Sequence, residues 1–260
     1  MRFKLTLTVE KEPFGNRLPI NYQYELSSFV YAAIHRSDAQ YSTWLHQNGF
    51  VADNKQFRLF TFSHLHVSKY NIAGDRLIIE SPTVEWQIAF LPERSTEEFI
   101  RGLFSEQVFT LGDRQSKFQF RVTGIELMPE PVFTTDTVFT TLSPVCIARH
   151  IPETNHIFYE SPDGPYAREA MLRNLRNKYA AYHGHEYIGS GTFELKLLSK
   201  PISKLVSIKT GTPYQTKIRG YTFRFKLKAD ADLLKVMWNS GLGEKGSMGF
   251  GCVGMSFDRI

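Results

Sequence analysis

The feature that most constrains the fold of this chain is an alternation between two hydrophobic periods. Residues 2–9 carry an apolar side chain at every second position, which predicts a half-buried β-strand. Between Leu26 and Ile34 the apolar positions recur every three or four residues instead, which predicts an amphipathic helix. A chain that keeps switching between these two periods is expected to pack its helices against a sheet.

The same order of segments occurs twice along the chain. Each half reads strand, helix, strand, strand, helix, strand, and the first half has an extra hairpin. This order is typical of the ferredoxin-like fold, so we predict an α+β protein with two such domains in tandem, at residues 1–128 and 138–260. Residues 129–137 are the predicted linker. The predicted helices lie near 22–34, 38–48, 95–106, 166–182 and 230–239, and the predicted strands at 2–9, 57–68, 76–81, 83–90, 117–127, 138–148, 192–198, 221–228 and 251–257. Asn21 and Ser37 are the predicted N-caps of the first two helices.

Composition excludes several classes of protein. An aromatic share of 14% is too high for a disordered chain, and no run of 18 apolar residues could span a membrane. The first residues alternate in polarity where a secretory signal would be continuously apolar. Cys146 and Cys252 are too few for a disulfide framework or a four-thiolate zinc site. We therefore expect a cytoplasmic protein without a metal or another cofactor.

The positive charge of the chain lies in its second half. Residues 1–128 hold 14 Lys or Arg and 14 Asp or Glu, whereas residues 129–260 hold 17 and 12, so the second half carries the whole excess of +5. Nine of these cations fall between Lys196 and Lys228, a stretch that contains no acidic residue. Such a stretch can bind a polyanion, and the alternative is a solvated lysine-rich sheet face.

A glycine-rich segment lies between the last predicted helix and the last predicted strand. Because glycine lets backbone amides approach a phosphate closely, this loop, with Lys245, can hold a nucleic-acid backbone. It is not a dinucleotide-binding or P-loop motif, because those run from a strand into a helix. A tight turn is the alternative interpretation. Its five glycines are Gly241, Gly243, Gly246, Gly249 and Gly251.

On these residues the chain resembles the CRISPR-associated endoribonucleases of the RAMP superfamily, which cut precursor CRISPR RNA within its repeats. The matching segments are the Met-Arg-Phe start, Asn21-Tyr22-Gln23-Tyr24, Leu59-Phe60-Thr61-Phe62-Ser63, Phe139-Thr140-Thr141-Leu142-Ser143-Pro144 and the glycine-rich loop. The resemblance implies two ferredoxin-like domains facing across a cleft. It also implies cleavage without a metal, leaving a 5′-hydroxyl on one product and a 2′,3′-cyclic phosphate on the other.

The resemblance also implies a set of catalytic residues. On a helical wheel Tyr31 and His46 both point away from the apolar face of their helices, and the catalytic Tyr and His of the family map onto them. The third catalytic residue of the family is a Lys shortly before the Phe-Thr-Phe segment. Here Arg58 stands at the matching place and Lys55 three residues earlier, so either could be the catalytic cation.

RNA binding is expected to fall mainly to the second half. Besides the glycine-rich loop, the predicted RNA-binding residues are Lys209, Lys217, Arg219, Arg173 and Arg176. The expected partner is CRISPR repeat RNA. A rival hypothesis is a non-catalytic RAMP subunit that holds processed RNA among the other subunits of an effector complex. Tyr31 and His46 are the residues that favour the enzyme.

Overall fold

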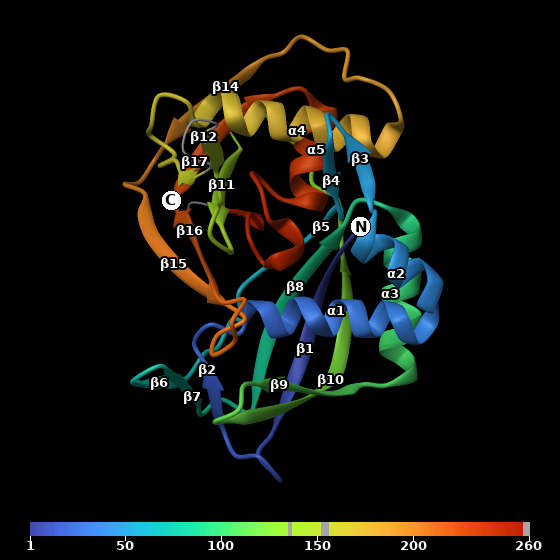
Figure 1. The fold of residues 1–260 in the computed structure, drawn as a ribbon, viewed down its shortest axis with the longest axis vertical. Coiled ribbons are helices and arrows are strands. Elements are labelled where there is room, and N and C mark those ends of the chain that lie inside the picture. The colour runs from blue at the N-terminus through green and yellow to red at the C-terminus, as the bar shows by residue number, and fades with distance from the viewer. Residues whose placement is uncertain (135–136, 152–155, 257–260) are drawn as a thin grey trace.

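The computed structural model describes residues 1–134, 137–151 and 156–256, and its two main sheets lie one above the other (Figure 1). The first sheet contains β1, β5, β8, β9 and β10 in the order β5-β8-β1-β10-β9, with every neighbouring pair antiparallel. β5, β8, β1 and β10 are the second, third, first and fourth strands of a ferredoxin-like unit. Their bounds are β1 (Arg2–Glu10), β5 (Phe60–Phe62), β8 (Thr83–Phe90), β9 (Val108–Gly112) and β10 (Lys117–Met128).

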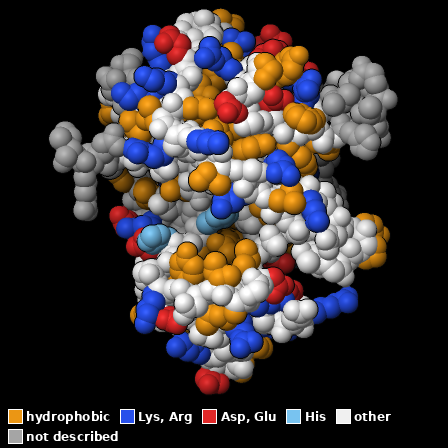
Figure 2. Space-filling model, turned by 90° about the vertical axis from the view of Figure 1, so that its left-hand side faces the viewer, with side chains coloured by type: hydrophobic (Ala, Val, Ile, Leu, Met, Phe, Trp, Pro, Cys, Tyr) orange, Lys and Arg blue, Asp and Glu red, His pale blue; other side chains and the backbone are white. Residues whose placement is uncertain are grey.

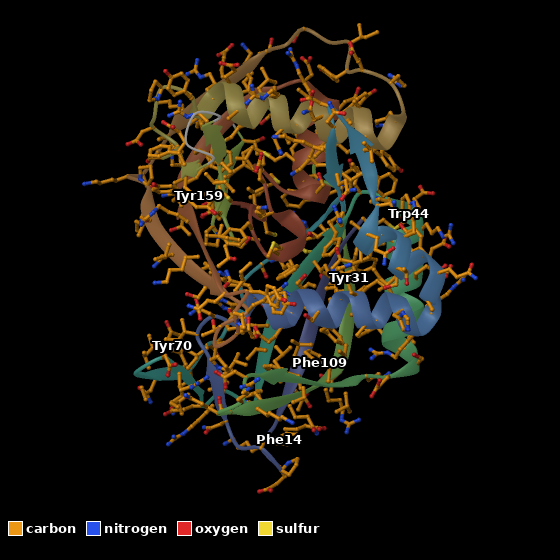
Figure 3. All side chains as sticks on the ribbon, in the orientation of Figure 1. Phe14, Tyr31, Trp44, Tyr70, Phe109 and Tyr159 are labelled. Atoms are coloured by element: carbon orange, nitrogen blue, oxygen red, sulfur yellow. The ribbon has the colours of Figure 1, made fainter. Side chains whose placement is uncertain are left out.

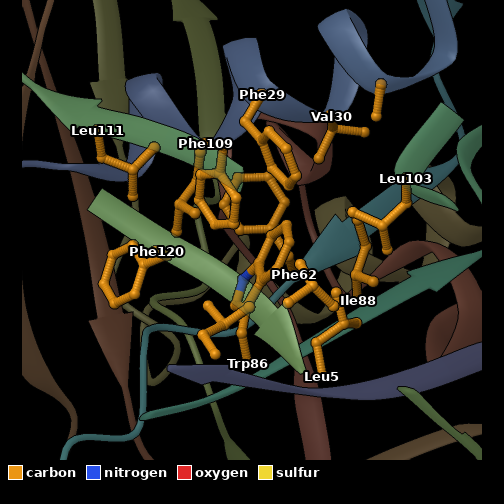
Figure 4. Close-up of a cluster of buried hydrophobic side chains, with 14 of the residues drawn as sticks. Leu5, Phe29, Val30, Phe62, Trp86, Ile88, Leu103, Phe109, Leu111 and Phe120 are labelled. Carbon is orange, nitrogen blue, oxygen red and sulfur yellow. The ribbon is translucent and has the colours of Figure 1, made fainter. Parts of the chain in front are cut away.

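Helices α1 (Gln23–Ser37) and α3 (Glu93–Ser105) pack on this sheet and enclose the first core. Phe29 of α1 stacks on Phe109 of β9 with ring centroids 3.8 Å apart, and Trp86 of β8 lies fully buried beneath them (Figure 4). The apolar face predicted for α1 is buried here, because Leu26, Val30 and the rest of that face are removed from solvent.

The second sheet repeats the arrangement of the first. Its order is β14-β17-β11-β18, which is again second, third, first and fourth strand of a ferredoxin-like unit. The strands are β11 (Val138–Thr141), β14 (Phe193–Leu197), β17 (Arg224–Ala229) and β18 (Val253–Met255), and the helices are α4 (Ala167–His183) and α5 (Ala231–Ser240). The predicted α+β class with tandem ferredoxin-like folds is therefore confirmed.

Several smaller elements are added to these two units. The helix α2 (Ala39–Gln47) follows α1, and a 3-10 turn, η1 (Gly246–Met248), lies in the glycine-rich loop. The remaining strands form a three-stranded sheet of β2 (Arg17–Pro19), β7 (Arg76–Ile79) and β6 (Tyr70–Ala73), and the pairs β3 (Phe50–Ala52) with β4 (Lys55–Phe57), β12 (Ala148–Ile151) with β13 (His156–Tyr159), and β15 (Ile202–Ile208) with β16 (Thr216–Thr222).

Four predicted strands differ from the structure, and the first of them is the strand expected over 138–148, in which β11 already ends at Thr141. The strand expected over 57–68 is interrupted at Leu59, whose φ of 55° turns the chain between β4 and β5. The strand expected over 221–228 is divided between β16 and β17. The β15–β16 pair was not predicted, because exposed apolar residues such as Leu205 obscure the polarity pattern of β15. The last strand is Val253–Met255, and residue 257 of its predicted range lies outside the described residues.

The described part of the predicted linker has no regular structure, whereas the predicted N-caps of α1 and α2 need correction. Residues 129–134 form neither helix nor strand, and residues 135 and 136 lie outside the described part of the chain. The N-cap of α2 is Asp38 and not Ser37, since the Asp38 carboxylate accepts a hydrogen bond from the amide of Tyr41 at 2.8 Å. Asn21 does not cap α1, because its side-chain oxygen accepts a hydrogen bond from the amide of Ser207.

A buried arginine joins the two halves of the molecule. Arg2 of β1 donates hydrogen bonds to the carbonyls of Val253 and Trp238 in the second half, and its guanidinium carbon lies 3.6 Å from the centroid of the Trp238 ring. The first strand of one unit is thereby fixed against the last helix and strand of the other. Among the described residues, no helix has both the length and the apolar composition needed to cross a membrane.

Candidate active site in the cleft between the two halves

A cleft of about 520 Å³ lies where α1, α2, the β3–β4 hairpin and β5 of the first half meet α4 and the glycine-rich loop of the second. Tyr31, which Figure 3 labels, lies at this junction. The face drawn in Figure 2 carries Lys and Arg side chains over both halves, so on this side positive charge is not confined to the second half. A cleft with cations on its walls can receive a polyanion.

Tyr31 of α1 and His46 of α2 approach each other in this cleft. Their ring centroids are 5.1 Å apart with an interplanar angle of 82°, so the two rings meet edge to face. The sharp turn at Asp38 allows the two consecutive helices to bring these side chains together. His46 is exposed, as the wheel predicted, whereas Tyr31 is half-buried and also packs against Phe60 of β5.

Burial raises the pKa of the Tyr31 phenol above its ordinary value, although hydrogen bonds with Arg58 and Ser247 act in the opposite direction. Tyr31 is therefore a neutral phenol near pH 7 and can donate a proton or a hydrogen bond. Ser247 belongs to the glycine-rich loop, and its carbonyl accepts a hydrogen bond from the Ser27 hydroxyl at 2.6 Å. The loop is thus fixed to the same helix face that carries Tyr31.

The two candidate cations, Lys55 and Arg58, have different partners in the cleft. Arg58 donates hydrogen bonds to the backbone carbonyl of His46 and, at 3.3 Å, to the side chain of Gln56. Lys55 instead forms an ion pair with Glu244 of the glycine-rich loop, at 3.1 Å. Both side chains line the cleft, but Arg58 contacts the two catalytic candidates directly while a carboxylate neutralises Lys55.

The glycine-rich loop lines the cleft with only part of its length. Lys245 and Gly246 are at the cleft surface, next to Ser247. The other four glycines of the loop, Gly241, Gly243, Gly249 and Gly251, are buried and do not line it, so their predicted contact with RNA needs correction.

Close packing explains why these four positions are glycine. A β-carbon on Gly249 would lie 2.5 Å from the Phe62 ring, and one on Gly251 would lie 2.1 Å from the carbonyl oxygen of Leu242. The φ angles of both residues are also positive. The tight-turn interpretation therefore holds for the buried part of the loop.

Lys178 of α4 is a structural residue that the sequence analysis did not single out. Its ammonium group is buried and donates hydrogen bonds to the carbonyls of Ser240, Gly241 and Gly243, at 3.0, 2.7 and 2.9 Å. Desolvation lowers the pKa of Lys178 to about 7. The signal available in the sequence was its spacing, because Lys178 continues the buried stripe of Met171, Asn174 and Leu175 along α4.

The other predicted RNA-binding residues are dispersed. Lys209 lines the cleft, whereas Lys217 and Arg219 lie on the β15–β16 pair outside it. Arg173 pairs with Glu169 on α4, and Arg176 points toward the backbone at Gly191. Neither of these two arginines lines the cleft, so they do not join the site that contains Tyr31 and His46.

A half-buried histidine of the first half contacts a side chain that packs against the glycine-rich loop. His64 follows β5, and its Nε2 atom lies 2.8 Å from the Nε2 atom of Gln23, whose side chain contacts the position of Gly249. Burial lowers the pKa of His64 to about 4, so this histidine is neutral at physiological pH.

Two family models match nearly the whole chain. The model described as CRISPR-associated protein Cas6, N-terminal, matches residues 17–123, and the model described as CRISPR associated protein Cas6, C-terminal, matches residues 128–255. The boundary between the two matches falls at the end of β10, before β11, which is the first strand of the second ferredoxin-like unit.

Relatives and solved structures show the same likeness. The chain is 28% identical to the CRISPR-associated endoribonuclease Cas6 of Pyrococcus furiosus, over 97% of this chain and 89% of the relative. It is 27% identical to the CRISPR-associated endoribonuclease Cas6 1 of Methanocaldococcus jannaschii, over 91% and 86%. A solved structure titled "CRISPR associated protein Cas6" superposes with a TM-score of 0.77 at 27% identity, covering 99% of each chain.

Proposed function

This chain belongs to the Cas6 family of CRISPR-associated proteins, and on that premise we propose that it cuts precursor CRISPR RNA by attack of a 2′-hydroxyl on the neighbouring phosphate. It is a CRISPR repeat-specific endoribonuclease of the RAMP type. In the proposed reaction a new bond forms between the 2′-oxygen and phosphorus, and the bond to the 5′-oxygen breaks. The products carry a 2′,3′-cyclic phosphate and a 5′-hydroxyl.

One observation carries this proposal: the edge-to-face approach of Tyr31 and His46 at the mouth of a cleft lined by cations. The reaction needs a base for the 2′-hydroxyl and an acid for the departing 5′-oxygen. Histidine is the side chain best suited to take up a proton near neutral pH. We assign the base to His46 and the acid to Tyr31, whose raised pKa keeps it protonated.

The negative charge that develops on the phosphorane must also be stabilised. Arg58 carries a guanidinium cation that hydrogen-bonds both Tyr31 and the backbone of His46, so we assign this role to Arg58. Lys245 at the surface of the glycine-rich loop and Lys209 supply further charge for the RNA backbone. In this scheme protein side chains supply all the acid, base and charge, so no metal is needed.

The test is cleavage of a synthetic RNA carrying one repeat from the source genome, in buffer containing EDTA. We expect cleavage to continue in EDTA. The downstream product should accept radiolabelled phosphate from polynucleotide kinase without prior phosphatase treatment, because it carries a 5′-hydroxyl. The His46→Ala variant should bind the RNA without cutting it. His35→Ala is the matched control, because His35 is an exposed histidine of α1 that does not line the cleft.

Two results would contradict the proposal. Binding of the repeat RNA by the wild type without cutting, between pH 6 and pH 9, would point to a non-catalytic RAMP subunit. Loss of cleavage in EDTA that Mg²⁺ restores would point to a metal-dependent nuclease instead.

A further inference from the structure

The face of α1 that carries Tyr31 also carries a second aromatic side chain. Tyr24 lies seven residues before Tyr31, which is two helical turns and about 10 Å along the helix axis. Both tyrosines line the cleft, and so does Ser27, which lies between them. The cleft therefore continues past the catalytic residues along one face of α1 and ends at Tyr24.

At this end of the cleft the β15–β16 pair reaches the first half of the molecule. The amide of Ser207 donates a hydrogen bond to the side chain of Asn21, just before α1. Lys209, at the end of β15, places its ammonium nitrogen 5.9 Å from the centroid of the Tyr24 ring and 5.7 Å from that of Tyr214. These distances allow a cation–π interaction with either ring.

The backbone at Lys209 has a conformation that lysine rarely adopts. Its φ angle is 52°, in the left-handed region that favours glycine or asparagine. The turn is fixed because the Lys209 carbonyl accepts hydrogen bonds from the amide of Thr212, at 3.2 Å, and from its hydroxyl, at 2.8 Å. A lysine held at a strained position beside a cleft indicates that its charge has a use there.

The surroundings of Tyr24 and Lys209 leave both available to a ligand. The Tyr24 ring packs with one side against the buried cluster of Val206, Ile208 and Phe250 and is only half-buried, while Lys209 is exposed. Within the described residues no carboxylate pairs with Lys209, in contrast to Lys55, which Glu244 neutralises.

We propose that Tyr24 and Lys209 form a nucleotide-binding subsite beside the catalytic end of the cleft, in which an unpaired base stacks on Tyr24 and Lys209 binds the adjoining phosphate. Aromatic rings and cations interleaved in this way are the usual means of holding single-stranded RNA. The inference rests on the proposed function, because it assumes that the RNA strand being cut lies along α1. It predicts that the repeat is single-stranded within a few nucleotides of the cleavage site.

The experiment uses the full chain and a synthetic repeat RNA with a 2′-deoxy nucleotide at the cleavage site, which permits binding and prevents cutting. Single abasic nucleotides are placed in turn at the three positions on either side of that site. Dissociation constants are measured for the wild type and for Tyr24→Leu, Tyr24→Phe and Lys209→Asn, of which the last keeps the left-handed turn. Tyr70→Leu and Lys69→Asn are the matched controls, because both residues are exposed and lie outside the cleft.

We expect Tyr24→Leu to weaken binding between about 5-fold and about 150-fold, which is the range measured for loss of base stacking, and Tyr24→Phe to bind like the wild type. One abasic position should weaken wild-type binding by a similar factor and have no further effect in Tyr24→Leu. Lys209→Asn should reduce the slope of log K against log salt by about 0.7. Equal thermal midpoints of Tyr24→Leu and Tyr24→Phe would show that the effect is not unfolding.

The failure of this inference can be told from the failure of the proposed function. If the wild type cuts the unmodified repeat while Tyr24→Leu and Lys209→Asn bind it as tightly as the controls do, the subsite is wrong and the proposed function stands. Additive losses from Tyr24→Leu and every abasic position would also overturn the subsite. If the wild type neither binds nor cuts the repeat, both proposals are wrong.

Discussion

Lys55 and Glu244 form an ion pair at 3.1 Å across the cleft, although they lie 189 residues apart in the chain. The pair joins the β3–β4 hairpin of the first half to the glycine-rich loop of the second. A second contact, from Asn177 of α4 to Asp53 at 3.0 Å, fixes the same hairpin. The β3–β4 hairpin, which ends immediately before Arg58, is therefore positioned by the second half of the molecule.

The different partners of the two cations predict different losses on mutation. Arg58→Ala should lower the single-turnover cleavage rate by about 10²-fold or more, because Arg58 contacts Tyr31 and the backbone of His46. Lys55→Ala should lower it by less than about 10-fold, since Glu244 already neutralises that charge. Rates measured at saturating protein decide the question, and the opposite order of losses would make Lys55 the catalytic cation.

Tyr31→Phe removes the phenolic hydroxyl and keeps the ring that packs against Phe60. We expect the single-turnover rate to fall by about 10²-fold to 10⁴-fold, the usual contribution of a positioned acid or base, with the dissociation constant for uncleavable repeat RNA unchanged. Tyr70→Phe, which alters an exposed tyrosine outside the cleft, should cut at the wild-type rate. A full rate for Tyr31→Phe would remove Tyr31 from the mechanism.

Lys178→Met is expected to destabilise the protein by about 3 kcal/mol. Methionine fits the space of the lysine stem but leaves three buried loop carbonyls without their donor. Urea unfolding measures the effect, and Lys235→Met on α5 is the control, because Lys235 is half-exposed and its ion pair with Glu130 is a surface pair. Equal stability of the two variants would mean that Lys178 does not hold the loop.

The lowered pKa of His64 predicts that the folded protein loses stability in weak acid. The unfolded chain binds a proton at His64 below about pH 6.5, whereas the folded protein, with a His64 pKa of about 4, does not. The unfolded state therefore binds more protons between these values, and the free energy of unfolding should fall by about 3 kcal/mol as the pH is lowered from 6.5 to 4.

A variant that cannot gain this proton isolates the effect of His64. The free energy of unfolding of His64→Gln, measured beside the wild type at pH 7, 5.5 and 4.5, should depend less on pH. Parallel curves for the two proteins would show that His64 is not the group that titrates.

Local patterning was enough to predict most of the fold. The period of 2.0 in β1 and the period of 3.6 in α1 each depend on side chains within one element, and their order along the chain defined the two ferredoxin-like units. The outward position of His46 could be predicted for the same reason, since a helix fixes the direction of each side chain relative to its apolar face.

Contacts between distant segments could not be predicted in this way. The sequence around Lys178 does not show that three carbonyls of a loop more than 60 residues later accept its hydrogen bonds. Four of the five loop glycines are packed against β5, against Val145 and Cys146, or against the loop itself. The partners of Lys55 and Arg58, and the meeting of Tyr24 with Lys209, likewise depend on how the two halves pack. The free energy of such contacts comes from desolvation and charge pairing across the cleft, which no local pattern of residues records.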